Sequence, residues 1–292
     1  MKLLFLANPN AAGRRTGHLL PAIRDAIARH EPGCDYHESQ DAADLRRQAE
    51  AAAHAGYDRV LVAGGDGSAH AAVNALRGTR TALGVIPLGH GNDLARALGV
   101  PLDPVAAVEF LLRAPVVSID LARVGDVVYG CVAGVGLDAA TNRRANAWRG
   151  RLTGHTRYFL TALYTLASYW AIWIELTSDT ESFSGEVMWV AIANTPNYGG
   201  GLRIAPQARL DDGLLDICII ERISTFGLLR LYPALLRGAH LGASCVRYFR
   251  TSRLRLEAPA GAELFGDGEF LGQLPLEISV EPAGLRVLGR LG

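Results

Sequence analysis

An acidic glycine loop follows an apolar run at residues 60–70, VLVAGGDGSAH. Asp66 stands between Gly65 and Gly67, where the apolar run ends. Glycine lets backbone N–H groups and a helix N-terminus approach a phosphate without side-chain obstruction. A carboxylate repels a phosphate, so Asp66 makes chemical sense here if a divalent cation or its bound waters accompany the phosphate. The alternative for this motif alone is a tight left-handed turn.

A second loop of this kind, PLGHGNDLAR (87–96), follows another apolar run and opens a helix. Asn92 is placed to cap that helix, and Asp93 favours its first turn electrostatically, which is the purely structural interpretation of both residues. Two glycine–acid loops at successive strand ends are aimed at the same edge of a sheet. Together they predict a cradle for a nucleoside triphosphate.

Two further loops extend the pattern: NPNAAG (8–13) near the start of the chain and FGDGEF (265–270) near its end. In the second, Asp267 and Glu269 are two residues apart, so in an extended chain both side chains face the same way. A pair of carboxylates beside a phosphate site could activate a hydroxyl acceptor by taking its proton. The alternative is a plain hairpin, because Asp-Gly is a strong turn signal.

The composition narrows the classes of protein. The 292 residues are 49% hydrophobic, enough to fill the cores of about two domains. With 29 Lys+Arg and 29 Asp+Glu, the chain has no overall charge that would attract nucleic acid, and we expect none as a partner. Lys2 is the only lysine and the pattern GxxxxGK[ST] is absent, which argues against a P-loop kinase.

Cysteine usage and apolar segments indicate the compartment. The four cysteines are scattered without a CxxC pair, as expected for reduced thiols in a cytoplasmic protein. The N-terminal apolar run reads as a first strand rather than a signal peptide. Residues 158–174 carry no formal charge but are too short and polar for a membrane span. We expect a buried helix running into a strand there, with a lipid-facing helix as the alternative.

The first part of the chain alternates strands and helices. This order predicts a parallel sheet with helices on both faces, and ligands bind such sheets outside the carboxyl ends of the strands. The expected strands are 2–8, 58–65 and 81–89, and the expected helices are 18–30, 41–56, 68–78, 91–99 and 103–114.

After about residue 116 strand patterns dominate, which predicts a second, β-rich domain of mainly antiparallel sheet (α+β). The expected domains are 1–119, completed by 284–292, and 120–283. The expected strands are 116–124, 126–137, 183–195, 214–223, 247–259, 262–272, 274–282 and 285–290, with helical blocks at 142–172 and 225–240.

Six motifs, in chain order, resemble the diacylglycerol kinase catalytic family, which includes sphingosine, ceramide and bacterial phospholipid kinases. They are NPNAAG, GGDGS, PLGHGNDLAR, NYGGG (197–201), DDGLLD (211–216) and GDGE (266–269). The resemblance covers essentially the whole chain. It implies an ATP- and Mg²⁺-dependent lipid kinase that transfers the γ-phosphoryl group to the hydroxyl of diacylglycerol or a related lipid. It also implies an active-site cleft between an ATP-binding α/β domain and a β-rich lipid-binding domain.

The resemblance also assigns roles to residues. It gives the acidic network around the catalytic Mg²⁺ to Asp66, Asp93 and Asp120, and the base to Glu269 or Asp267 without separating them. A structural Mg²⁺ would be held by the carbonyls of Leu210 and Leu214 and the carboxylate of Asp212, where an ordinary turn is the alternative. The ATP-binding residues would be Asn8, Pro9, Asn10, Ala11, Ala12, Gly64, Gly65, Asp66, Gly67, Ser68, Ala69, His70, His90 and Asn92.

Three departures from the family pattern lie near the ATP loops. Ser68 and His90 stand where the family usually has threonine, and Tyr36 aligns loosely with a nucleotide-contacting threonine. One alternative is an NAD kinase-like enzyme, which shares a GGDG loop. Another is a non-catalytic protein that senses lipid or nucleotide, for which His90 and Tyr36 are the best support. A lipid kinase would touch membranes transiently, at the inner membrane face. The sequence leaves open which lipid is used and the oligomeric state, a homodimer included.

Overall fold

The computed structural model describes residues 2–9, 17–147, 161, 164–165, 168–259 and 261–291. The chain divides into two compact units. Unit 1 is Met1–Leu121 with Pro282–Gly292, and unit 2 is Ala122–Glu281. The chain leaves unit 1 within β5 (Val116–Val124) and returns within β15 (Leu276–Leu288). The domain boundaries expected from the sequence each lie two residues from these crossing points.

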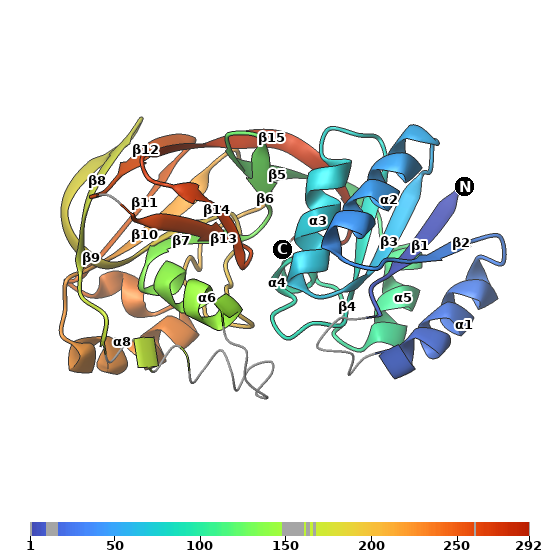
Figure 1. Ribbon diagram of the computed structural model, residues 1–292, viewed down its shortest axis with the longest axis horizontal. Helices are drawn as coiled ribbons and strands as arrows, with labels where there is room; N and C mark the ends of the chain where they lie inside the picture. The colour runs from blue at the N-terminus through green and yellow to red at the C-terminus, as the bar shows by residue number, and fades with distance from the viewer. Residues whose placement is uncertain are drawn as a thin grey trace. The chain divides into compact units, whose positions relative to one another are not determined.

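Unit 1 contains a parallel sheet in the order β15-β4-β3-β1-β2, which confirms the predicted parallel arrangement (Figure 1). Its central strands are nearly continuous apolar runs because both faces of the sheet are covered. The strands other than β15 are β1 Leu3–Ala7, β2 Asp35–Glu38, β3 Arg59–Gly64 and β4 Ala82–Pro87. The edge strand β2 was not predicted: its sequence, DYHE, has no apolar alternation, and three of its four residues are exposed.

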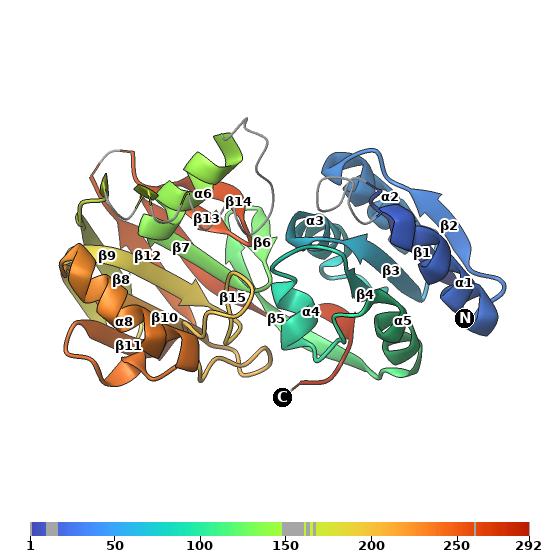
Figure 2. The same cartoon turned by 90° about the horizontal axis from the view of Figure 1, so that it is seen from below.

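The helices of unit 1 cover both faces of its sheet, as predicted. α2 packs against α3 and α1 against α5, and the two pairs lie on opposite sides of the strands (Figure 2). Asp41 caps α2 and Asp103 caps α5 through backbone N–H groups, which fixes where these helices start. The helices are α1 Leu20–His30, α2 Ala42–His54, α3 Asp66–Leu76, α4 Asp93–Ala97 and α5 Pro104–Arg113, with a 3₁₀ turn at Gly17–Leu19.

Unit 2 is built mainly from antiparallel strands around a core of buried aliphatic and aromatic side chains, which confirms the predicted β-rich domain. Its strands are β6 Val127–Tyr129, β7 Val132–Gly136, β8 Ile172–Ser178, β9 Ser182–Ala193, β10 Leu215–Glu221, β11 Val246–Thr251, β12 Arg253–Glu257, β13 Glu263–Gly266 and β14 Glu269–Gln273. Its described helices are α6 Leu137–Ala147, α8 Thr225–Arg237 and the 3₁₀ turn His240–Gly242.

Several predicted strand limits were wrong. The run 126–137 is two strands, β6 and β7, and the run 247–259 is also two, β11 and β12. Conversely, a single strand, β15, takes the place of the two predicted strands 274–282 and 285–290. It passes through Ala283 with a φ of 49°. The amide of Ala283 donates to Asp120 Oδ1 at 2.8 Å, so a side chain supports this irregular point in the strand.

The predicted helical block 142–172 lies largely outside the described residues. Within the described part, α6 begins at Leu137, earlier than expected, and β8 begins at Ile172. Thr161 and Thr165 are buried, and the Thr165 hydroxyl donates to the carbonyl of Thr161 four residues before it. Among the described residues, none of the helices has the length and apolar character needed to cross a membrane.

Candidate functional site

Three loops meet at the carboxyl ends of β1, β3 and β4, which are neighbours in the sheet of unit 1. Asn8, directly after β1, donates from Nδ2 to Ser68 Oγ at 2.9 Å. Its backbone amide donates to the carbonyl of Ala63 at 2.9 Å, and the amide of Leu88 donates to the carbonyl of Gly64 at 2.8 Å. The structure therefore brings together the three segments in which the sequence placed the ATP-binding residues.

The glycines of this site allow the loops to touch one another. A Cβ on Gly64 would lie 2.4 Å from the Ser68 side chain, and a Cβ on Gly89 would lie 2.6 Å from the Cα of Gly65. Gly64, Gly65 and Gly67 all lack a positive φ, so the alternative prediction of a left-handed turn for GGDG is wrong. Gly65 and Gly89 are needed because the two glycine loops approach each other closely, whereas Gly64 leaves room for the Ser68 side chain.

The Asp66 carboxylate links the first glycine loop to the second. Its Oδ2 accepts from the amide of Asn92 at 3.1 Å, and its Oδ1 accepts from the amide of Asp93 at 2.9 Å. A Cβ on Gly91 would lie 2.7 Å from Asp66 Oδ2, so glycine at 91 makes room for this carboxylate. Asp66 therefore caps α4, and each of its oxygens keeps capacity to accept another bond or a cation.

Asn92 does not cap α4 with its side chain, contrary to the expectation. It stands at the N-cap position with a φ of 52°, and its Oδ1 accepts from the amide of Gly89 at 2.9 Å. Its Nδ2 donates to the carbonyl of Gly89, also at 2.9 Å, so the side chain closes its own loop. Arg96, which the sequence did not single out, donates from Nε to the carbonyl of Gly91 at 2.9 Å and fixes the same loop.

The N-terminus of α3 is the remaining helix end at this site. α3 begins at Asp66, and its first intrahelical bond runs from the amide of Ala69 to the carbonyl of Gly65. The first amides of a helix have no intrahelical acceptor and attract anions. The α4 end already holds the Asp66 carboxylate, so a phosphate is better accommodated at α3.

The other predicted ATP residues have varied positions. Ser68 and Ala69 are buried in the first turn of α3, whereas His90 is half-buried in the loop between β4 and α4. The His70 ring lies 3.3 Å from Asn74 Nδ2 on the same helix. Pro9 is half-buried next to Asn8. Three predicted residues lie outside the described part of the chain: Asn10, Ala11 and Ala12.

A cavity of about 550 Å³ lies within unit 1, between α1 and the β1 and β2 strands. Tyr36 stands in its wall, with its ring 5.2 Å from that of Phe5 and 4.1 Å below the guanidinium of Arg24. The Tyr36 hydroxyl donates to Glu38. Burial is the main cause that raises the pKa of Tyr36 to about 12, and the Glu38 carboxylate is the second. Sequence reasoning missed Glu38, because β2 itself carried no strand signal, and it also missed Arg24 on α1.

Asp120 is 5% exposed on β5 and supports the amide of Ala283. The described residues contain no group of three or more His, Cys, Asp or Glu side chains that could hold a metal ion. A Mg²⁺ that arrives with nucleotide phosphates needs only one or two protein carboxylates. Asp66, whose carboxylate accepts from the backbone amide of Asp93, and Asp93 itself would meet that smaller requirement.

The GDGE motif in unit 2 is a hairpin. Gly266 pairs with Glu269, and the two turn residues Asp267 and Gly268 have φ values of 52° and 84°. Positive φ at both positions is the signature of a tight two-residue hairpin turn. The premise of an extended chain, on which a shared face for Asp267 and Glu269 was expected, is therefore wrong.

The two acids of this hairpin have different surroundings. The Asp267 carboxylate accepts from three consecutive amides, those of Gly130 at 2.8 Å, Cys131 at 3.1 Å and Val132 at 3.3 Å. These contacts hold the break between β6 and β7 and explain why the predicted strand is split there. Glu269 is exposed at the first position of β14.

The DDGLLD motif forms a turn that runs into β10, which begins at Leu215. Asp212 Oδ1 accepts from the amide of Leu214 at 3.2 Å, and its Oδ2 lies 2.9 Å from a guanidinium nitrogen of Arg250. Leu210 is buried and Gly213 has a φ of 72°. The Asp212 side chain therefore closes a local turn. The carbonyls of Leu210 and Leu214, the predicted magnesium ligands, both lie within this short segment.

Asp216, the last residue of that motif, was not assigned a role from the sequence. It is fully buried on β10, and Tyr248 donates to its Oδ1 while its Oδ2 has no hydrogen-bond partner. Burial raises the pKa of Asp216 to about 6. An orphaned buried carboxylate oxygen beside Asp212 is what a nearby cation would satisfy, so the residues present fit a magnesium site here.

The chain thus combines glycine loops at the carboxyl ends of a parallel sheet with a second, β-rich unit. Residues 2–124 match the model of the diacylglycerol kinase catalytic domain. Residues 131–289 match that of the YegS C-terminal NAD kinase beta sandwich-like domain. The chain belongs to the diacylglycerol kinase family.

Individual relatives agree with this assignment. A diacylglycerol kinase of Mycobacterium tuberculosis is 38% identical over 297 residues, which cover 98% of this chain and 94% of that protein. A YegS-like lipid kinase of Pseudomonas aeruginosa is 34% identical over 250 residues, covering 84% and 80%. A crystal structure of a diacylglycerol kinase from Bacillus anthracis has the same fold, with a TM-score of 0.77 at 20% identity, covering 99% of this chain and 97% of that one.

Proposed function

We propose that this protein transfers the γ-phosphoryl group of ATP to the free hydroxyl of diacylglycerol in an Mg²⁺-dependent reaction. The observation that carries the proposal is the junction of the three loops around Asn8, Asp66 and Asn92, where an α-helix N-terminus and a carboxylate lie together. A phosphate chain and a divalent cation are the pair of ligands that such a site accommodates. The names of the relatives supply the lipid acceptor.

Unit 1 supplies the groups that bind ATP. The first amides of α3 would receive phosphate oxygens, and Asn8 would position the loop after β1 through its bond to Ser68. Asp66 and Asp93 would hold Mg²⁺, which neutralises the phosphate charge when bound. The cavity walled by Tyr36 and Arg24 has the apolar and charged groups to take the nucleoside part.

Unit 2 supplies the base, and Glu269 suits this role better than Asp267. Asp267 already accepts three amide hydrogen bonds, which commit its carboxylate to the turn between β6 and β7. Glu269 is exposed and can reach a hydroxyl. It would take the proton of the lipid hydroxyl as that oxygen attacks the γ-phosphorus, while the bond to the β–γ bridging oxygen breaks and ADP leaves.

A second, structural magnesium is proposed for the DDGLLD turn. Asp212 would hold it with the carbonyls of Leu210 and Leu214, and the buried Asp216 would add a second carboxylate nearby. Its contribution would be to the stability of unit 2 rather than to phosphoryl transfer.

The test is a radiolabelled-ATP assay with diacylglycerol, phosphatidylglycerol, sphingosine and ceramide in mixed micelles, and with NAD in solution. We expect Mg²⁺-dependent label in phosphatidic acid and little in the other acceptors. Label in NAD would establish the NAD kinase alternative. Absence of label from every acceptor, with nucleotide binding intact by calorimetry, would favour the sensing protein.

The departures near the ATP loops give this test a second arm. His90→Thr restores the residue usual in the family, and a lower KM for ATP in this variant would show that position 90 contacts the nucleotide. An unchanged KM would remove His90 from the proposed site.

A further inference from the structure

The helix α8 presents large apolar side chains on two faces. Leu228 and Leu235, seven residues apart, are buried against unit 2. Around the rest of the helix lie four exposed residues: Phe226, Leu229, Tyr232 and Leu236, with exposed fractions of 74%, 49%, 46% and 45%. Surface helices normally turn polar residues outward, so a second apolar face marks an interaction surface.

The helix ends of α8 are well formed, so this exposure is a property of an ordered element. Ser224 caps the first turn by accepting from the amide of Gly227 at 3.1 Å. Gly238 closes the last turn in the left-handed conformation, with a φ of 69°. The exposed face is thus held in a fixed helical arrangement.

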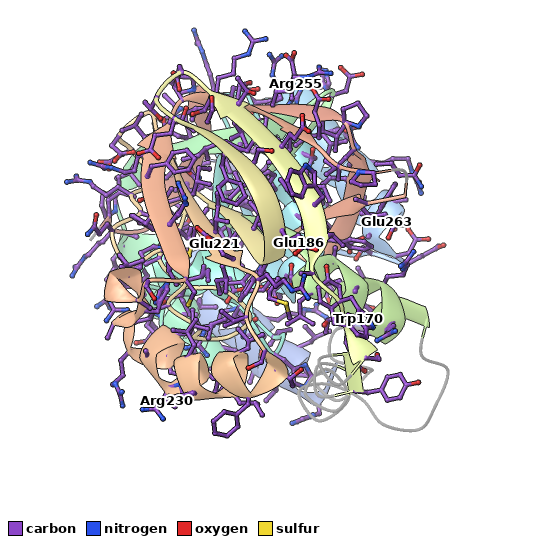
Figure 3. The ribbon with its side chains drawn as sticks, turned by 90° about the vertical axis from the view of Figure 1, so that its left-hand side faces the viewer. Trp170, Glu186, Glu221, Arg230, Arg255 and Glu263 are labelled. Atoms are coloured by element: carbon purple, nitrogen blue, oxygen red, sulfur yellow. The ribbon has the colours of Figure 1, made fainter. Side chains whose placement is uncertain are left out.

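The stretch of sequence that contains α8 carries charge of one sign. From Arg222 to Leu256 the sequence contains no Asp or Glu, although the whole chain has equal numbers of acidic and basic residues. Other arginines of this stretch, such as Arg222 and Arg247, pair with acids elsewhere in unit 2. By contrast, Arg230 and Arg237, the two arginines on α8, form no ion pair with any residue in the described part of the chain. Figure 3 shows Arg230 projecting from α8 away from the strands of the unit.

An anionic bilayer fits this combination best. Apolar residues that enter the headgroup–acyl boundary, beside arginines that contact lipid phosphates, are typical of helices that lie on a membrane surface. A symmetric contact between two copies of α8 would bring Arg230 and Arg237 of both chains together, and repulsion opposes that arrangement. Trp170, 80% exposed, lies on the same lower side of unit 2 in Figure 3 and belongs to a residue type enriched at membrane interfaces.

We infer that α8 docks the protein on anionic phospholipid bilayers, with its exposed apolar face entering the headgroup region and Arg230 and Arg237 contacting lipid phosphates. The choice of a bilayer rests on the proposed lipid kinase function, because the acceptor of such an enzyme resides in a membrane. The docking step itself requires neither ATP nor phosphoryl transfer, so it can be measured separately.

The experiment is flotation with vesicles of phosphatidylcholine alone, or of two parts phosphatidylcholine and one part phosphatidylglycerol, without nucleotide. We expect the wild-type protein to bind the anionic vesicles and to release at high salt. The affinity of the double variant Phe226→Ser/Leu229→Ser for these vesicles should be lower by about tenfold or more. Leu102→Ser, an exposed apolar residue of unit 1, is the matched control and should bind like the wild type.

A charge arm tests the arginines. Arg230→Glu/Arg237→Glu should lose the preference for phosphatidylglycerol, whereas Arg113→Glu, at the end of α5, should keep it. Circular dichroism and a thermal melt establish that each variant folds, and Leu229→Ser alone replaces the double variant if that one does not. Wild-type binding by both α8 variants, or no vesicle binding by the wild type, would overturn the inference.

Activity separates this inference from the proposed function. With a short-chain diacylglycerol dispersed as monomers, the α8 variants should retain wild-type turnover, but with vesicle-embedded diacylglycerol they should lose most of it. If the wild type phosphorylates no lipid yet binds anionic vesicles through α8, the proposed function fails and the docking surface stands. A wild-type dimer that dissociates in the α8 variants, with vesicle binding unchanged, would assign the face to a second copy instead.

Discussion

The tripeptide Gly-Asp-Gly occurs twice in this protein, at 65–67 and at 266–268, with two different conformations. At the first, Gly65 has a φ of −96° and Asp66 begins a helix; at the second, Asp267 and Gly268 form a left-handed hairpin turn. Each aspartate accepts backbone amides from a distant segment, two at Asp66 and three at Asp267. The same three residues therefore adopt different conformations, and the surrounding structure decides both the conformation and the role of the aspartate.

The difference lies in what each carboxylate has left to offer. Each oxygen of Asp66 accepts one amide hydrogen bond, and the residue lies at a helix N-terminus, the proposed place of a phosphate and its cation. Asp267 is committed to the turn between β6 and β7, and its neighbour Glu269 is the exposed acid of that hairpin. The comparison predicts a catalytic role for the aspartate of the first motif and a structural role for that of the second.

The largest expected effect is at Glu269. In Glu269→Gln the amide cannot take a proton, so kcat with diacylglycerol should fall about 10²- to 10⁴-fold while the KM for ATP stays near the wild-type value. Steady-state kinetics in mixed micelles measure both. Glu263→Gln, an acid on the same hairpin, should keep wild-type kcat. Wild-type turnover by Glu269→Gln would place the base elsewhere.

Asp66→Asn should have the next largest effect, a loss of activity on the order of 10²- to 10³-fold, because the amide cannot hold Mg²⁺ as a carboxylate does. The matched control is Asp103→Asn, since Asp103 also accepts two helix N-terminal amides but lies outside the glycine loops. Both variants should lose a similar, small amount of stability in urea. Equal activity in the two would reduce Asp66 to a helix cap and end its proposed catalytic role.

Asp267→Asn should act on stability rather than on chemistry. An amide nitrogen would face at least one of the three amides that now donate to Asp267, and the free energy of unfolding should fall by about 1–3 kcal/mol. Chemical denaturation measures this loss, and kcat of the folded fraction should stay within about threefold of wild type. A large loss of kcat with unchanged stability would reverse the assignment of the two acids.

The smallest expected effect concerns a third Asp-Gly turn, at Asp212 and Gly213. Asp212→Asn should lower the melting temperature by about 2–4 °C and abolish any further gain on adding Mg²⁺. Thermal melts across a magnesium titration provide the measurement, with Asp211→Asn as the neighbouring control. If wild type and both variants melt alike at every magnesium concentration, this turn binds no magnesium.

Much of the fold could be predicted because hydrophobic period and turn residues are local signals. Strands β1, β3 and β4 are continuous apolar runs, and the helices between them carry caps such as Asp41 and Asp103. The exposed edge strand β2 escaped because edge pairing requires only backbone groups. The splitting of 126–137 escaped because its cause, Asp267, comes more than 130 residues later in the chain.

The sequence by itself determined the two kinds of sheet, the glycine loops at strand ends and the six motifs that resemble the diacylglycerol kinase family. Only the tertiary structure decided which partner each acid holds: Asp66 reaches amides 26 and 27 residues away, and Asp267 reaches amides 135 to 137 residues away. The physical reason is that side-chain hydrogen bonds depend on which strand ends meet in space. Strand order in a sheet sets those meetings, and a local pattern of residue types carries no record of them.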